Sequence, residues 1–337
     1  MRNKGQKMFE DKRLLVTYSP HIREDRLTSK IMLSVVYALI PAIAVSIYYF
    51  GLHALRIYFL TIIFTLLFEA LFLKIRSKSI SLNDNSALVT SLLLAMNLPP
   101  TSPWWLIMIG SFVAIIIGKQ LFGGLGQNPF NPALVARVLL LIAWPARMNE
   151  WIMPQPIISG SFFDAVSTST PLGEAKTEII THGHIITNNL VDLTGSFLGD
   201  IGGSLGEVSA LALILGGLFL LYRGIISWHI PAAYIISFLS IIIPYWFFFP
   251  DKTIDPTSHL FAGGLMLGVF FMATDMVTTP ITRIGQIIFG IGCGLITAVI
   301  RLFGGYPEGV SFAILIMNAF VPLIDYYIRP KSFGESR

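Results

Sequence analysis

The run Ser86–Pro100, SALVTSLLLAMNLPP, decides how this chain is folded. Its apolar part is about twelve residues long, whereas a helix that crosses a bilayer needs about 20. The run then reaches Asn97 and the dipeptide Pro99-Pro100, and the residue before a proline is disfavoured in a helix. The stretch therefore predicts a short or broken helix.

The composition places this broken helix in a membrane. Of the 337 residues, 54% are hydrophobic and only 12% are charged, and the mean hydropathy is +0.72. So much apolar surface cannot be buried in a soluble core, so we predict an all-α integral membrane protein. The net charge of +4 does not indicate nucleic-acid binding, because the basic residues lie in short gaps between apolar runs.

The apolar runs predict about ten transmembrane helices, with both termini on one side. The predicted spans are 31–50, 55–73, 86–97, 104–119, 133–145, 207–222, 230–249, 259–274, 284–300 and 310–328. They divide the chain into a cytoplasmic N-terminal segment (1–30), a first membrane repeat (31–147), an external loop (148–205), a second membrane repeat (206–328) and a cytoplasmic tail (329–337).

The distribution of Lys and Arg fixes the predicted orientation. Residues 1–30 are rich in basic side chains, which the positive-inside rule places in the cytoplasm. Most of the 23 Lys and Arg residues then lie inside, and Arg137 lies within a span. Those predicted outside are Arg56, Arg147, Lys176, Lys252 and Arg301. The interval 148–205 is therefore external, and both termini are cytoplasmic in a bacterial or archaeal cell membrane.

The two halves of the chain share a pattern. Leu-Phe-Gly-Gly begins at Leu121 and again at Leu302, and the proline breaks at Pro99 and Pro280 are separated by the same offset of 181 residues. With five spans between the copies, the two halves have opposite orientations. This pattern predicts two inverted five-helix repeats, whose broken helices meet near the midplane and form a binding or permeation site.

Polar residues at the breaks are candidates for that site. Asn128, Asn131 and Asp275 are candidates for a flavin site or an ion path, because polar groups within membrane segments are usually functional. For Asp275 a structural role, as a cap on the next helix or in an ion pair with Arg283, is as open as a functional one. For Glu69, near the inner end of its span, we expect the side chain to reach the membrane interface.

The external interval contains a hydroxyl-rich run, DAVSTSTPL at 164–172. On composition alone such a run is an ordinary loop, because Ser and Thr hydroxyls often bond to their own backbone. The only cysteine, Cys293, excludes an iron–sulfur cluster held by this chain alone, so any redox work needs an organic cofactor. Two histidines, His182 and His184, are too few to predict a metal site.

Taken together, the chain resembles the D subunit of the Rnf complex, an ion-translocating ferredoxin:NAD oxidoreductase, and a related protein, the B subunit of the sodium-translocating NADH:quinone oxidoreductase. The segments that carry the resemblance are Ser19-Pro20-His21-Ile22, 123–133, 164–172, Gly206-Glu207, 223–228 and Thr274-Asp275.

The resemblance implies a covalently bound FMN. In that family the motif Asp-x-x-Ser-Gly-Ala-Thr accepts FMN through a phosphoester on its threonine, which corresponds here to Thr170, with Asp164 and Ser167 as motif residues. This chain has Thr168 and Ser169 where the family has Gly and Ala, so these hydroxyls stay open as acceptors. We expect Thr170 on an external loop, where loss of its hydroxyl changes stability by less than ~0.5 kcal/mol.

The resemblance also implies a role and partners. The chain would pass electrons between ferredoxin and NAD, through the covalent FMN and a second flavin such as non-covalent riboflavin, coupled to sodium or proton movement. Its partners would be iron–sulfur subunits, a second FMN-carrying subunit and a flavin transferase. Two alternatives remain, a solute channel of the urea-channel kind and a structural anchor without cofactor.

Overall fold

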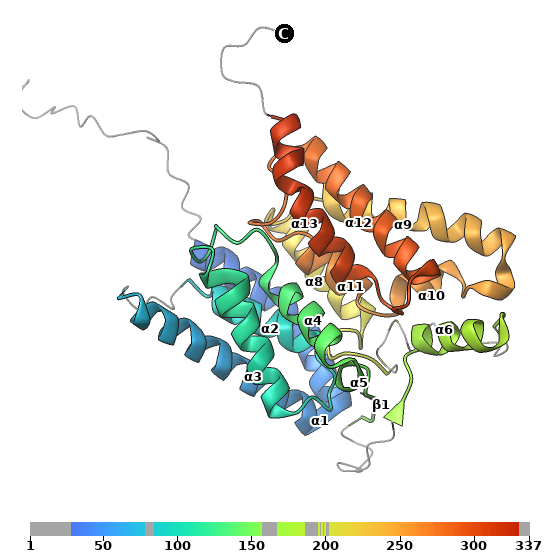
Figure 1. Cartoon of the computed structure of the whole chain (residues 1–337), viewed down its shortest axis with the longest axis horizontal. Helices are drawn as coiled ribbons and strands as arrows, with labels where there is room; N and C mark the ends of the chain where they lie inside the picture. The colour runs from blue at the N-terminus through green and yellow to red at the C-terminus, as the bar shows by residue number, and fades with distance from the viewer. Residues whose placement is uncertain are drawn as a thin grey trace, which may run out of the picture.

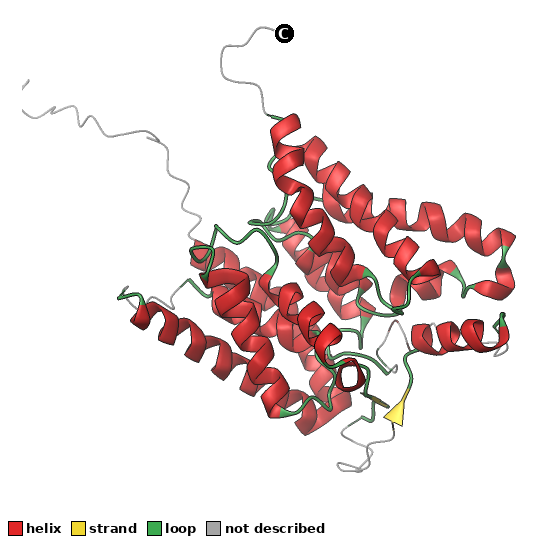
Figure 2. Ribbon diagram, in the orientation of Figure 1, coloured by secondary structure: helices red, strands yellow, loops and turns green. Residues whose placement is uncertain are grey.

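The computed structural model describes residues 28–77, 84–156, 167–185, 195, 197, 199 and 202–329. In these ranges the protein is helical, apart from one two-stranded ladder in which β1 (Trp151–Ile152) pairs antiparallel with β2 (Ser167–Thr168) (Figure 2). The helices of the first half are α1 (Thr28–Ile75), α2 (Ser86–Met96), α3 (Trp104–Phe112), the π-helix η1 (Val113–Gln120), α4 (Pro132–Ala143) and α5 (Pro145–Met148).

The remaining helices follow the ladder in the chain. They are α6 (Pro171–His182), α8 (Ala210–Tyr222), α9 (His229–Phe248), the 3-10 helix η3 (Pro250–Lys252), α10 (Pro256–Phe261), α11 (Leu265–Leu267), the π-helix η4 (Gly268–Met272), α12 (Arg283–Phe303) and α13 (Val310–Tyr327). Figure 1 shows α9, α12 and α13 running side by side, with α6 beside α10 at one end of the molecule.

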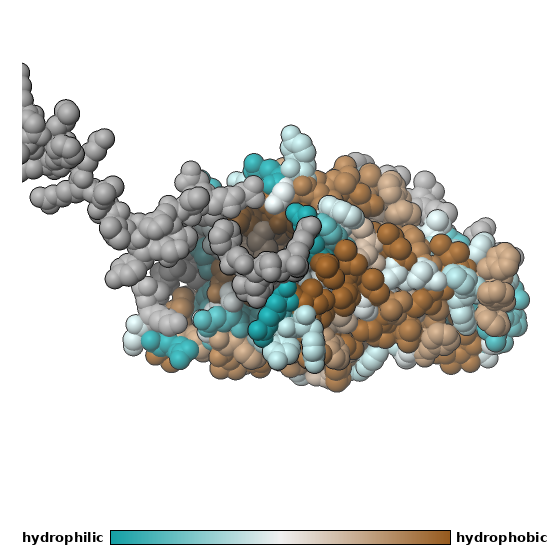
Figure 3. Space-filling model, turned by 90° about the horizontal axis from the view of Figure 1, so that it is seen from above, coloured by the Kyte–Doolittle hydropathy of each residue, from teal (hydrophilic) through white to brown (hydrophobic). Residues whose placement is uncertain are grey.

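The helices have the character of a multi-pass membrane protein. In the described residues, α1, α9, α12 and α13 are long and apolar enough to cross a bilayer, and α2, α3 with η1, α4 and α8 are shorter apolar helices. Large hydrophobic side chains are exposed along them, and they cover much of the face seen in Figure 3. The prediction of an all-helical membrane protein is confirmed, and the ten-span layout stays a prediction.

The long helix α1 is a hairpin of two helices. Gly51 has φ 54° and ψ −127°, which is not helical, and glycine adopts positive φ readily. On either side of this kink, Ser46 Oγ and Tyr58 Oη are 2.9 Å apart, although twelve residues of straight helix would separate them by about 18 Å. The two arms therefore fold back on each other, in agreement with the two separate spans predicted at 31–50 and 55–73.

The predicted break after α2 is present, and the second half of the chain fills it. The backbone N–H of Gly206 donates to the carbonyl of Met96 at 2.7 Å, and that of Leu205 donates to Leu98 at 3.3 Å. Carbonyls at a helix end have no partner within the helix, so a buried end needs partners from elsewhere. The segment that enters the second half supplies them.

Close helix contacts depend on small residues, as is common in membranes. A Cβ on Gly216 of α8 would lie 2.1 Å from the carbonyl oxygen of Ala38 in α1. A Cβ on Gly294 of α12 would lie 2.4 Å from the carbonyl oxygen of Tyr234 in α9. These glycines let the helix backbones approach closely.

Two contacts match at the predicted repeat offset. Arg137 donates to the side chain of Asn97. In the second half, Asn318 donates to the carbonyl of Thr278 at 3.1 Å when its amide is oriented to satisfy its neighbours. Asn97 and Thr278, like Arg137 and Asn318, are 181 residues apart. The first Leu-Phe-Gly-Gly copy begins directly after η1, and the second begins with Leu302 and Phe303, the last two residues of α12. These contacts share the predicted offset, and the inverted orientation of the two halves stays a prediction.

Orientation is tested by reporter fusions at two positions. We expect a phosphatase that works only outside the cytoplasm to be inactive when fused after Arg337 and active when inserted after Gly183, because basic residues flank the predicted inner ends. Phosphatase activity of the Arg337 fusion would reverse the predicted orientation.

Candidate functional site

A buried ion network joins the two halves of the chain. Arg137 of α4 is 7% exposed, and its guanidinium donates to Asn97 Oδ1 at the end of α2, to Glu207 Oε1 at 3.5 Å and to Glu308 Oε2. Ser204 Oγ donates to Glu207 at 2.7 Å, and the N–H of Gly264 donates to Glu308 at 2.7 Å. We call these six residues the central network. A buried charge is tolerated only when paired and hydrogen-bonded, and this network meets both conditions.

The hydroxyl motif lies directly beside the central network. Thr170, Glu207 and Glu308 line the same narrow pocket, which encloses about 290 Å³ including space open to solvent. Phe261 and Gly263 form part of its wall. The predicted acceptor is therefore placed next to the contact between the two halves.

Thr170 is the N-cap residue of α6. Its Oγ1 accepts from the backbone N–H of Gly173 at 3.1 Å, and Pro171 occupies the first helical position. A phosphoester on this oxygen would place the phosphate at the N-terminus of a twelve-residue helix, where the helix dipole favours negative charge, although Glu207 and Glu308 line the same pocket. The position suits an attached phosphate.

The sequence missed this helix, and the correction changes one expectation. We expected Thr170 on a loop, where removal of its hydroxyl is nearly neutral, but an N-cap hydroxyl contributes about 0.5–2 kcal/mol. The signal was present, since Thr170-Pro171 followed by Glu174 is a helix-start pattern. The polar character of the whole interval hid it.

The other motif residues are only partly placed. Ser167 and Thr168 form β2, and Ser169 is exposed, with its Oγ 3.3 Å from Glu174 Oε2. Asp164 lies outside the described residues. Within the motif, Thr170 is the residue whose hydroxyl caps α6.

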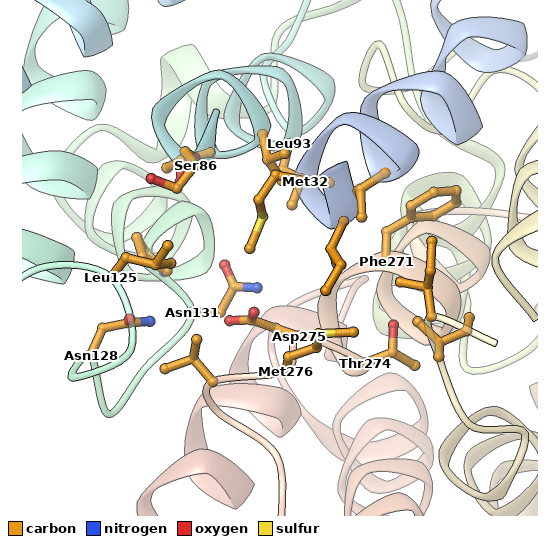
Figure 4. A pocket seen from close by; sticks show the side chains of 18 of the residues that line it. Met32, Ser86, Leu93, Leu125, Asn128, Asn131, Phe271, Thr274, Asp275 and Met276 are labelled. Carbon is orange, nitrogen blue, oxygen red and sulfur yellow. The ribbon is translucent and has the colours of Figure 1, made fainter. Parts of the chain in front are cut away.

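A second cavity collects the other predicted candidates. Asn128, Asn131 and Asp275 line one pocket, together with Lys119 and Ser86, and it encloses about 750 Å³ including its open mouth (Figure 4). Its apolar walls are formed by Met32, Leu93, Phe270 and Phe271. We call this cavity the asparagine pocket. Its few polar groups on apolar walls are typical of small-molecule sites.

The two asparagines differ in their hydrogen bonds. Asn131 caps α4 by accepting from Ala133 N at 3.1 Å, and its amide nitrogen lies 3.4 Å from the carbonyl of Met272. Asn128 donates to the carbonyl of Phe130 at 3.1 Å, but its Oδ1 is buried without a hydrogen-bond partner. A buried acceptor without a donor is costly, so Asn128 is suited to receive a donor from a bound molecule.

The structure decides between the open roles of Asp275. Helix α12 is capped by Thr282, whose Oγ1 accepts from Gly285 N at 3.1 Å, so Asp275 is not its cap. Arg283 forms no ion pair with it among the described residues. Asp275 instead accepts from Thr278 at 3.3 Å and turns toward Asn131 in the asparagine pocket (Figure 4).

The expectation for Glu69 is wrong. Its side chain does not reach the membrane interface but is 3% exposed, and its Oε1 accepts from Lys119 Nζ at 2.6 Å and from Gln120 at 2.8 Å. Lys119, which lines the asparagine pocket, also donates to Ser86 at 2.6 Å. The sequence reasoning considered Glu69 alone and missed its partner fifty residues later.

The two pockets are connected by side-chain contacts. Arg137 of the central network bonds to Asn97, whose amide nitrogen is 3.8 Å from Met272 Sδ, and Asn131 bonds to the carbonyl of Met272. Since Glu207 and Glu308 reach the Thr170 pocket, packed polar contacts run from one site to the other. In the described part of the chain, no three His, Cys, Asp or Glu side chains are grouped as metal ligands.

Helical spans, a hydroxyl motif beside a buried ion network and a polar cavity between broken helices define a multi-pass membrane protein with two candidate ligand positions. Comparison with known proteins gives its family. The chain belongs to the NQR2, RnfD, RnfE family, whose pattern matches residues 15–334.

Characterised relatives are similar over almost the whole chain. The D subunit of the Na(+)-translocating ferredoxin:NAD(+) oxidoreductase complex of Acetobacterium woodii is 45% identical over 326 residues, with 96% of each chain covered. The D subunit of the proton-translocating complex of Clostridium ljungdahlii is 45% identical over 333 residues, with the same coverage. The D subunit of the ion-translocating oxidoreductase complex of Shigella boydii is 41% identical over 350 residues, which cover 96% of this chain and 99% of the relative.

The central network makes a testable contribution to stability. We expect Arg137→Leu to destabilise the protein by about 3–5 kcal/mol, because Glu207 and Glu308 would stay buried without their shared counter-charge. Arg147→Leu is the control, since it removes an exposed pair with Glu150 worth about 0–1 kcal/mol. Unfolding of both variants in detergent, followed by tryptophan fluorescence, measures the difference, and equal stabilities would contradict the assigned role.

Proposed function

We propose that this chain is the flavin-carrying membrane subunit of a redox-driven ion pump. It would pass electrons between ferredoxin and NAD and couple this transfer to movement of sodium ions or protons. The observation that supports this most directly is the Thr170 hydroxyl at the start of α6, within a flavin-acceptor motif, in a chain 45% identical to subunits of complexes so named. A protein that acts only as a urea-channel-like pore or as a structural anchor would have no use for this motif.

The residues around Thr170 fit an FMN bound through its phosphate. The side chain is half-buried and lies at the N-terminus of α6, where the helix dipole favours negative charge. Thr170 supplies the attachment oxygen, and Asp164 and Ser167 complete the motif. The flavin, when bound, supplies the one- and two-electron chemistry that a chain with a single buried cysteine lacks.

The asparagine pocket is the proposed place for a second, non-covalent flavin such as riboflavin. Its walls are apolar, and the unpartnered oxygen of Asn128 suits a ring N–H donor. Asn131 and Asp275 add polar groups nearby, which also makes them candidates for the ion path. The contacts through Arg137, Asn97 and Met272 would hold the two flavin positions in a fixed relation.

The proposed function also implies an assembly. Electrons must enter and leave through iron–sulfur subunits and a second FMN-carrying subunit, because this chain contains no cluster ligands of its own beyond Cys293. We place the complex in a bacterial or archaeal cell membrane, with the Thr170 motif on the external face and both termini in the cytoplasm.

The attachment site is tested by variants that keep the helix cap. Asparagine caps a helix as well as threonine does but offers no hydroxyl for a phosphoester. We therefore expect Thr170→Asn to abolish covalent FMN at little cost in stability, and Thr170→Ser to retain it. Mass spectrometry of the peptide 164–176, from protein matured with its flavin transferase, measures the adduct.

The neighbouring hydroxyls provide the control for this experiment. Ser169→Ala removes an exposed hydroxyl next to the acceptor and is expected to leave FMN attachment intact. An adduct at full occupancy in Thr170→Asn would move the acceptor to Thr168 or Ser169. Absence of any adduct in the unmutated chain would refute covalent attachment.

The second flavin is tested at Asn128. Asn128→Leu keeps the side-chain size but removes the buried acceptor, so we expect non-covalent flavin to be lost while FMN on Thr170 remains. Acid extraction and chromatography give the ratio of free to covalent flavin. Asn149→Leu, at an exposed site just after α5, is the matched control. Unchanged extractable flavin in Asn128→Leu would place the second flavin elsewhere.

A further inference from the structure

A third cavity lies along α6, between this helix, the η3–α10 segment and the end of α12. It encloses about 850 Å³ including space open to solvent. Leu172 and Ile179 of α6 and Phe303 of α12 contribute apolar surface, and Lys176, Lys252 and Arg301 contribute positive charge. We call this cavity the α6 pocket. It is separate from the narrow pocket at Thr170 and from the asparagine pocket.

The α6 pocket has an excess of positive charge. Among the described residues that line it, none is Asp or Glu, and the His259 ring adds further nitrogen atoms to its wall. Burial, and then the charge of Arg301, lower the pKa of Lys176. The carboxylate that faces Arg301 is that of Glu308, which is already held by Arg137 and by the N–H of Gly264. An anionic group in the pocket would relieve this repulsion.

Two buried nitrogens on the wall have no hydrogen-bond partner. The Nδ1 of His259 and the Nε of Arg301 are both unpaired, although each residue is only 5% exposed. Their other nitrogens are bonded, His259 Nε2 to Thr253 at 2.8 Å and Arg301 to the carbonyls of His259 and Ala262 at 2.5 and 3.3 Å. Buried unpaired groups are rare, so their presence on one pocket wall points to a ligand with polar atoms.

The α6 pocket is within reach of the attachment residue. Leu172 lines both this pocket and the narrow pocket of Thr170. Lys176 is six residues after Thr170, which is about 9 Å along a helix, and the ribityl chain and fused rings of FMN extend beyond that. Lys176 also fixes α6 in place, because its ammonium donates to the carbonyls of Ile300, Arg301 and Tyr306 at 3.3, 3.2 and 2.9 Å.

The narrow pocket at Thr170 is a poorer place for a flavin ring. It is about one third as large as the α6 pocket, and the carboxylates of Glu207 and Glu308 line it. A ring that gains negative charge on reduction is repelled by carboxylates and attracted by ammonium and guanidinium groups. Size and charge both favour the α6 pocket.

We infer that the α6 pocket holds the isoalloxazine ring of the flavin attached to Thr170, with Arg301 and Lys252 stabilising the charge that the ring gains on reduction. This inference rests on the proposed function. One electron passes to the ring from a reduced donor. The donor is the flavin of a neighbouring subunit in the complex, or dithionite in a titration. The bond to Thr170 is neither made nor broken. The tether supplies the ring at high effective concentration.

Occupancy is tested by labelling a cysteine in the pocket. The native Cys293 is fully buried, so it gives little background. Ile179→Cys places a thiol on the pocket wall, and Thr177→Cys places one on an exposed part of α6 outside the pocket. The full-length protein is compared after expression with and without the flavin transferase. We expect FMN attachment to slow maleimide labelling of Ile179→Cys at least fivefold. The labelling rate of Thr177→Cys is expected to stay the same.

The outcomes separate the two proposals. If mass spectrometry finds no FMN on Thr170, the proposed function fails. If FMN is attached but labelling at Ile179→Cys is equally fast with and without it, the ring lies elsewhere and this inference is wrong. Labelling is also compared in phosphatidylglycerol and phosphatidylcholine vesicles. If phosphatidylglycerol slows labelling at Ile179→Cys to the same extent in protein with and without FMN, the pocket holds an anionic lipid and this inference is wrong.

A redox titration tests the role of the charges. Lys252 is exposed, so Lys252→Gln is expected to fold, and it should lower the equilibrium constant for one-electron reduction of the covalent flavin about threefold, or roughly 30 mV at 59 mV per tenfold change. Arg147→Gln removes the same charge on the same predicted side but outside the pocket, and should shift the potential much less. Equal shifts in the two variants would overturn the assignment of Lys252.

Discussion

The fold depends on satisfying broken helices inside an apolar medium. A helix that stops within the membrane leaves carbonyls and polar side chains without water, and each unsatisfied group costs several kcal/mol. Here the end of α2 is completed by Gly206 and Leu205 from the second half, and Asn97 at that end is held by Arg137. Arg137 in turn needs the carboxylates of Glu207 and Glu308, which also come from the second half. The first half therefore cannot satisfy its own break, and the two halves form one structural unit.

The same constraint brings the two candidate sites together. Glu207 and Glu308 face the pocket of Thr170, while Asn97 and Met272 lead to Asn131 and the asparagine pocket. Helix α6, which begins at Thr170, is attached to the second half by Lys176 and by a small hydrophobic cluster of Leu172, Ala175, Ile254 and Ala262. A flavin on α6 would therefore be held by the element that carries it, and its position relative to the central network would be fixed by packing.

The sequence predicted the helices better than it predicted the environment of the charges. The apolar runs, the kink at Gly51 and the break after Met96 follow from local patterns, because hydrophobic length, glycine and proline act on neighbouring residues. The pairing of Glu69 with Lys119 and that of Arg137 with Glu308 connect residues far apart in the chain, and no local pattern encodes them. Asn128, Asn131 and Asp275 line one pocket because all lie at breaks, where broken helices tend to meet, and their role in a flavin site or an ion path stays a prediction. Helix α6 was missed because its polar surface lacks the apolar periodicity that marks a membrane helix.

The charges at the centre of the protein also bear on coupling. Arg137 and Arg301 balance Glu207 and Glu308, so these four groups leave no net charge to compensate an electron on a flavin in the asparagine pocket, whereas Lys176 and Lys252 give the α6 pocket its excess positive charge. An electron placed on a flavin in this low-dielectric region is an unpaired buried charge, and such charges are expensive unless a cation accompanies them. The electrostatic requirement is the same for a sodium ion and for a proton.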